Sequence, residues 1–127
     1  MRMRWTILAF AVYLSLLTAA LCMTNPFAAA GSYQGVLRRL FEGYVAPAAH
    51  FLAFLPLGWW AMAIRVRVSR LARLGLLVSY AFATEAAQGL IPGRTPEWSD
   101  VAQNLAGVGV GAIAWLLVRK SARSADA

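Results

Sequence analysis

The chain has 127 residues, of which 61% are hydrophobic and only 13% are charged, and its formal net charge is +7. Soluble domains average about 25% charged residues, so this composition argues against a soluble domain and is typical of a membrane protein. The basic residues lie between apolar segments instead of gathering on one polar face, which argues against a nucleic-acid partner. The only cysteine is Cys22, so no disulfide can form within the chain.

Four apolar segments follow one another along the chain, each close to the length that crosses about 30 Å of hydrocarbon at 1.5 Å per residue. None of them alternates with a period of two, so each predicts a helix. The first has 19 residues without a charge, which is longer than the usual core of a signal peptide, and we expect it to remain as a helix. The segments are 5–23, 47–64, 74–91 and 96–118.

These segments predict an all-α fold, an integral membrane bundle of four transmembrane helices. We expect one domain over residues 1–120, followed by a short polar tail at 121–127. Nine of the twelve basic residues lie at the N-terminal end, between the second and third segments, and after the fourth. The positive-inside rule therefore predicts that both termini are cytoplasmic and that the protein is multi-pass.

Polar residues gather at the predicted outer end of this bundle. One histidine begins the second segment, two residues lie late in the third, one lies in the following connection, and two lie in the first turns of the fourth. Four separate pieces of chain thus bring polar groups to one leaflet. These residues are His50, Glu85, Gln88, Arg94, Asp100 and Asn104.

The connection between the third and fourth segments carries its own turn signals. Pro92 is expected to stop the third helix, and Gly93 supplies backbone freedom. Thr95 is predicted as the N-cap of the fourth helix, with Pro96 at its first position and Glu97 complementing the helix dipole.

The fourth segment has one face with a distinct composition. Asp100, Asn104, Gly107 and Gly111 fall at offsets of 0, 4, 7 and 11, which place them on one side of a helix. The face carries polar side chains at its outer end and only glycines farther in. We expect Gly107 and Gly111 to permit close packing against another helix.

Glu85 is predicted to lie deep in the hydrocarbon, where a charged carboxylate costs about 2.5 to 3.5 kcal/mol. It should therefore face a partner or water, and Arg94 and His50 are the available cations. In one interpretation Glu85, Arg94 and Asp100 form a structural clasp that holds the helices together. In the other they form a functional site, which is the default for ionisable groups inside a membrane.

Four motifs occur in order along the chain: H-F at 50–51, E-x-x-Q at 85–88, P-G-R at 92–94 and D-x-x-x-N-x-x-G at 100–107. Their combined spacing, over about residues 48–118, resembles the VanZ-like family of bacterial membrane proteins. This chain departs from many members, which carry an Asp-Lys pair shortly before the histidine where residues 46–49 here are Ala-Pro-Ala-Ala. The resemblance implies a small multi-helix protein of the bacterial inner (cytoplasmic) membrane, in a family whose founding member is linked to low-level teicoplanin resistance.

Three functions remain open, besides a purely structural or assembly role. The first is recognition of an anionic, lipid-linked envelope component, with Arg94 as the anion contact and Gln88 and Asn104 as orienting donors, beside Glu85, His50 and Asp100. The second is catalysis, in which His50, Glu85 and Asp100 act on a lipid phosphate as acids or bases, or two carboxylates hold a divalent cation. The third is a proton-coupled carrier that uses Glu85, which would require a homo-oligomer. Membrane lipids are the expected partners, and we expect no cofactor and no zinc site.

Overall fold

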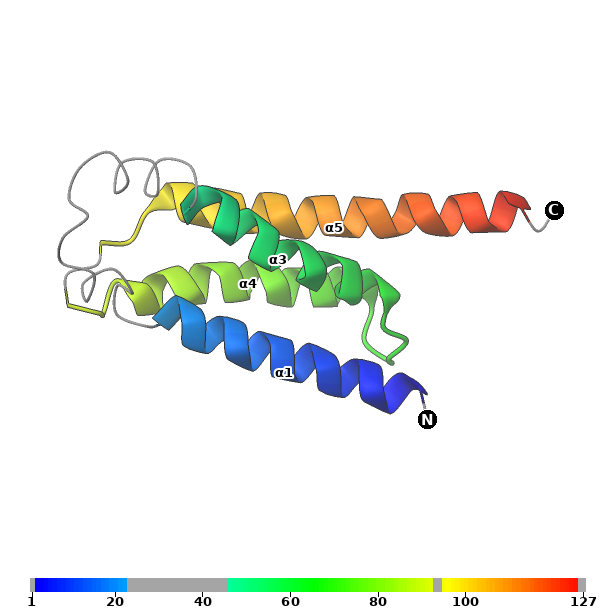
Figure 1. Cartoon of the computed structure of the whole chain (residues 1–127), viewed down its shortest axis with the longest axis horizontal. Coiled ribbons are helices and arrows are strands. Elements are labelled where there is room, and N and C mark those ends of the chain that lie inside the picture. The colour runs from blue at the N-terminus through cyan, green and yellow to red at the C-terminus, as the bar shows by residue number, and fades with distance from the viewer. Residues whose placement is uncertain (1, 23–45, 93–94, 126–127) are drawn as a thin grey trace, which may run out of the picture.

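The computed structural model describes residues 2–22, 46–92 and 95–125. Within these ranges the regular secondary structure is entirely α-helical, which confirms the predicted all-α class. Successive described helices run in alternating directions along one bundle, and α5 extends well past the others (Figure 1). The helices are α1 (Arg2–Cys22), α3 (Ala46–Ala63), α4 (Arg70–Gln88) and α5 (Trp98–Ala125).

Among the described helices, only α5 is both long and apolar enough to cross a membrane, with a mean hydropathy of 1.7 over its most apolar window. Shorter apolar stretches occupy Trp5–Leu21 in α1 and Ala48–Ala63 in α3. α4 carries two arginines in its first turn and Glu85 near its end. The four predicted crossings are thus supported by length and composition for α5 alone, and stay a prediction for the other three helices.

The ends of α4 differ from the predicted range of 74–91. Ser69 has an extended backbone, and its hydroxyl accepts a hydrogen bond from the Ala72 N–H at 3.1 Å, which is the geometry of an N-cap. The predicted start was too late because an apolar count leaves out the two arginines of the first turn. At the other end the helix stops at Gln88, and the backbone turns before it reaches Pro92.

The start of α5 also differs from the prediction. The Asp100 N–H donates to the Glu97 carbonyl at 3.0 Å, so Glu97 holds the position before the helix and Thr95 and Pro96 precede it. Thr95 is therefore not the N-cap, and Asp100 is the acidic residue in the first turn. At its other end α5 continues through 119–125, so the predicted polar tail is helical as far as the structure describes it.

The core of the bundle lies between the four described helices, and α1 contributes Leu17 to it. Phe54 and Leu57 of α3 and Ala81 of α4 have no exposed surface, and Val108 of α5 is 5% exposed. The rings of Phe54 and Tyr80 lie 5.7 Å apart, which adds an aromatic contact between α3 and α4.

Hydrogen bonds and ring contacts attach α1 to this core. The Tyr13 hydroxyl donates to the Ala53 carbonyl of α3 at 2.7 Å, and its ring meets Trp60 edge to face at 5.4 Å. The hydroxyls of Thr18 and Tyr80 lie 2.7 Å apart and link α1 to α4. The first helix is thus part of the described bundle.

α3 and α5 pack backbone against backbone. A Cβ built on Gly107 or Gly111 of α5 would collide with carbonyl oxygens of α3, and one on Gly58 of α3 would collide with a carbonyl oxygen of α5. Since these atoms belong to helix backbones, they cannot give way as a flexible side chain would. The absence of side chains at these three positions therefore sets how closely the two helices approach.

Gly111→Ala should destabilise the protein by about 1–3 kcal/mol, because the added methyl group forces α3 and α5 apart. Gly109→Ala is the matched control, since it lies on the same helix with nothing within 4 Å of its built Cβ. Thermal unfolding in detergent, followed by circular dichroism, should show a lower melting temperature for the first variant only. Equal melting temperatures would contradict this account of the interface.

Candidate functional site

His50 connects α3 to α5. It is 8% exposed, and its Nδ1 lies 3.1 Å from the Oδ1 of Asn104, which is itself 1% exposed. Its Nε2 lies 3.5 Å from Asp100 Oδ2, an ion-pair distance that is longer than a normal hydrogen bond. Asp100 and Asn104 are one turn apart, so one side of α5 meets both nitrogens of the imidazole.

Two protonation states fit this arrangement. A doubly protonated His50 would donate to the Asn104 carbonyl oxygen and face the Asp100 carboxylate with its second N–H. A neutral His50 would keep its proton on Nε2, toward Asp100, and accept at Nδ1 from an Asn104 amide in the opposite orientation. In both states α5 meets the two ring nitrogens, with Asn104 beside Nδ1 and Asp100 beside Nε2.

Glu85 connects the end of α4 to the start of α5. It is 5% exposed, and its Oε1 accepts a hydrogen bond of 2.5 Å from the backbone N–H of Glu97. Gly89 permits this approach, because a Cβ built there would lie 2.5 Å from Cγ of Pro96. A carboxylate near the first turn of α5 is also favoured by the positive end of the helix dipole.

Two buried polar atoms at the end of α4 have no hydrogen-bond partner among the described residues. They are Oε2 of Glu85 and Nε2 of Gln88, and Gln88 is only 3% exposed. Leaving a buried polar group unsatisfied costs about 1–3 kcal/mol, and more for a charged group. One atom can accept a hydrogen bond and the other can donate one, one turn apart, so together they offer both halves of a polar contact.

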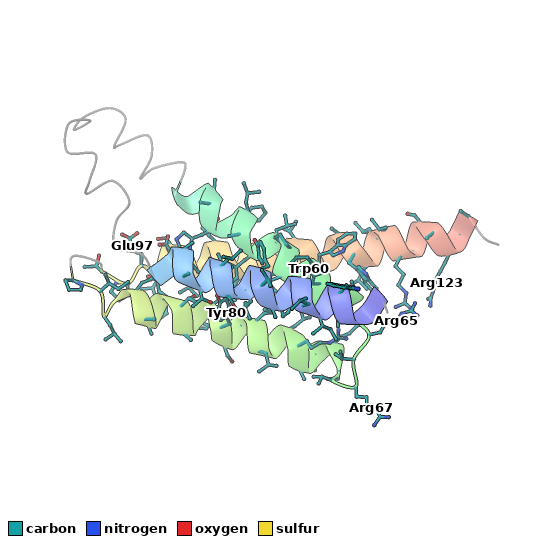
Figure 2. The ribbon with its side chains drawn as sticks, turned by 60° about the horizontal axis from the view of Figure 1, so that its bottom comes forward. Trp60, Arg65, Arg67, Tyr80, Glu97 and Arg123 are labelled. Atoms are coloured by element: carbon teal, nitrogen blue, oxygen red, sulfur yellow. The ribbon has the colours of Figure 1, made fainter. Side chains whose placement is uncertain are left out.

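We call this region the polar end of the bundle: it is where α3 and α5 begin and α4 ends. Figure 2 shows Glu97 near this end, while Arg65 and Arg123 lie toward the opposite one. Among the described residues, His50 faces Asp100 and not Glu85, while Glu85 accepts from a backbone amide. The region contains His50, Glu85, Gln88, Asp100 and Asn104.

Two residues of the predicted outer connection fall outside the described part of the chain. Gly93 and Arg94 lie beyond the described residues, so the expected anion contact of Arg94 stays a prediction. Within the described ranges, no three side chains of the metal-ligating types His, Cys, Asp and Glu are grouped as they would be around a metal ion.

Comparison with known proteins identifies the family. A family model described as VanZ/LLP1 matches residues 6–119. The chain belongs to the VanZ/LLP1 family. No match was found among curated proteins or among solved structures. The VanZ/LLP1 match begins within α1, and the family together with the apolar α5 indicates a membrane protein.

Asn104→Leu should destabilise this VanZ-family protein by about 1–3 kcal/mol, because it leaves the buried Nδ1 of His50 without a partner in a space of similar volume. Gln103→Leu is the matched control, because Gln103 is the preceding residue and only partly buried. Chemical denaturation in detergent micelles compares the two variants with the wild type. Equal stability of all three proteins would show that the His50–Asn104 contact does not stabilise the fold.

Proposed function

We propose that the protein is a multi-pass protein of the bacterial inner (cytoplasmic) membrane, with four crossings and both termini in the cytoplasm. The alternating helix directions support an even number of crossings (Figure 1). The distribution of basic residues supports the orientation, since nine of the twelve lie in segments that this topology places inside. In this setting the polar end of the bundle faces the outer leaflet.

Thiol labelling of intact cells tests this topology, in a background in which Cys22 is replaced by serine. A cysteine at Ser32 should react with a membrane-impermeant reagent from outside, whereas one at Val68 should react only after the cells are permeabilised. Val68 is exposed and avoids Ser69, whose hydroxyl caps α4. Labelling of Val68→Cys but not Ser32→Cys in intact cells would reverse the orientation and reject the outer placement of the polar end.

The polar end, in this proposal, binds the headgroup of an anionic, lipid-linked component of the cell envelope. The supporting observation is a pair of buried atoms on Glu85 and Gln88 that have no hydrogen-bond partner among the described residues. A hydroxyl or amine of the headgroup can donate to Glu85 Oε2, and an oxygen of the same headgroup can accept from Gln88 Nε2. Arg94 follows α4 by six residues and would supply a planar fork for a phosphate or carboxylate.

Binding is favoured over catalysis by the position of His50. A general base must reach the proton that it removes, and His50 is buried, with only 8% of its surface exposed. Asn104 occupies Nδ1, and Asp100 faces Nε2. The polar end is therefore suited to hold a ligand between fixed groups, and binding an envelope component in the outer leaflet is the route by which the protein would alter susceptibility to teicoplanin, a glycopeptide.

Glu85→Gln separates a binding site from a structural clasp. The amide oxygen can still accept from the Glu97 N–H, whereas the second oxygen is replaced by a donor, so folding should be retained and ligand binding should weaken about tenfold or more. Glu97→Gln is the matched control, since it removes the same charge from an exposed side chain. Arg94→Lys, which keeps the charge but loses the fork, should also weaken binding.

Native mass spectrometry of lipid-linked cell-wall precursors retained by the protein in nanodiscs measures binding, and a melting curve for each variant measures stability. A Glu85→Gln protein that binds as the wild type does but melts earlier would favour the clasp. Unchanged binding by both Glu85→Gln and Arg94→Lys would reject the proposed site.

A further inference from the structure

A cavity of 390 Å³ lies at the end of the bundle opposite the polar end. It is formed where α3 ends, where the connection 64–69 leads into α4, and along the last part of α5. Four arginines line it, and no acidic residue does. These are Arg65, Arg70, Arg73 and Arg119.

Two of these arginines share one aromatic ring. The guanidinium carbon of Arg70, at the start of α4, lies 4.9 Å from the centre of the Trp115 ring, and that of Arg119 lies 5.1 Å from it. Both distances are within the range of cation–π attraction. The Trp115 ring therefore contacts one guanidinium group from α4 and one from α5. Without this shared contact the two positive charges would repel each other.

Arg73 has a different role from the other three. Its Nη1 donates to the Ile64 carbonyl at 2.5 Å, and its Nε donates to the Ser69 carbonyl at 3.4 Å. It thus holds both ends of the connection that forms one wall of the cavity. Arg65, Arg70 and Arg119 keep their hydrogen-bond donors available to a ligand, since no hydrogen bond to another described residue engages them.

No carboxylate neutralises this cluster within the part of the chain that the structure describes. The three acidic residues in that part are Glu85, Glu97 and Asp100, and all belong to the polar end. Glu85 is 15 residues along α4 from Arg70, which is about 22 Å. In Figure 2 the labelled Arg65 and Arg123 lie at the arginine-lined end, and Arg67 points away from the bundle.

We propose that this cavity binds the phosphate of an anionic phospholipid headgroup in the cytoplasmic leaflet. Guanidinium groups from three segments, the 64–69 connection, α4 and α5, line the cavity. They offer several donors to the oxygens of a phosphate, and their mutual repulsion is relieved when an anion binds beside them. The apolar side chains of Met62, Val66 and Val118 also line the cavity and offer a surface to the adjoining acyl chains. The inference rests on the proposed membrane topology but not on the proposed ligand of the polar end.

The lipid source is favoured over a soluble phosphate by where the cavity lies. Arg119 follows the apolar part of α5 directly, and Trp59 and Trp115 line the same cavity. Tryptophan is enriched at the boundary between hydrocarbon and headgroups, and basic pockets between helices on the cytoplasmic side are suited to anionic headgroups. A phosphate at that depth is one attached to a lipid.

Native mass spectrometry of the full chain in nanodiscs of mixed phosphatidylglycerol and phosphatidylcholine tests the proposal. The wild type should retain phosphatidylglycerol preferentially, and the double variant Arg70→Gln/Arg119→Gln should lower this preference about tenfold. Arg67→Gln/Lys120→Gln is the matched control, since it removes the same charge from exposed residues that do not line the cavity. It should change the preference little.

Three results would overturn the proposal. The first is equal retention of the two lipids by the wild type, which needs no variant. The second is an equal loss of preference in both double variants, which would show diffuse surface charge. The third is displacement of the lipid by millimolar glycerol phosphate, which would indicate a soluble ligand.

Three further variants identify the cause of a lost lipid preference. Arg70→Lys/Arg119→Lys keeps the charge and should retain part of the preference, so its melting curve and lipid retention separate a binding defect from unfolding. Glu85→Gln and Arg94→Lys should retain phosphatidylglycerol as the wild type does. A failure of the outer site and a failure of the arginine cavity are therefore distinguishable.

Discussion

The close contact between the backbones of α3 and α5 determines the geometry of the polar end. Gly107 lies against the carbonyl of Phe51, which is the residue after His50. The short imidazole side chain can reach Asn104 only because no side chain separates the helices one turn farther along. A larger apolar residue at Gly107 would therefore separate α3 from α5 and lengthen the His50–Asn104 contact, although it carries no polar group. The packing of the interface and the geometry of the polar end thus depend on each other.

The link from α4 to α5 is of another kind, because Glu85 bonds to backbone instead of to a side chain. Such a contact depends on the path of the chain before α5 and is available to any residue at position 97 that has a backbone N–H. It also uses only one carboxylate oxygen, and the other is buried without a partner in the part of the chain that the structure describes. The same residue thus links α4 to α5 and presents an acceptor, so in the proposed function the structural contact and the ligand contact are two uses of one carboxylate.

The sequence predicts the four helices because each is a long, mainly apolar segment without a period of two. It predicts that His50, Asp100 and Asn104 converge because helical offsets and alternating directions are regular. The local details follow weaker rules. The start of α4 depends on a Ser69 cap placed before two arginines, which an apolar count excludes. The partner of Glu85 is a backbone N–H, and no residue type in the sequence marks it. The Thr-Pro pair before α5 does not cap the helix, because α5 begins only after Glu97, whose backbone N–H bonds to Glu85.

The unequal lengths of the helices have a consequence for the surrounding bilayer in the proposed setting. At 1.5 Å per residue, the 28 residues of α5 extend about 42 Å, whereas the 18 residues of α3 extend about 27 Å. A hydrocarbon core of about 30 Å fits the apolar part of α5 but exceeds α3. The membrane would therefore thin on the side of α3 or the bundle would tilt, each at a fraction of a kcal/mol per ångström of hydrophobic mismatch. Such a protein would gather where the bilayer is thin, and water and headgroups would then lie closer to His50 than the position of that residue in the sequence suggests.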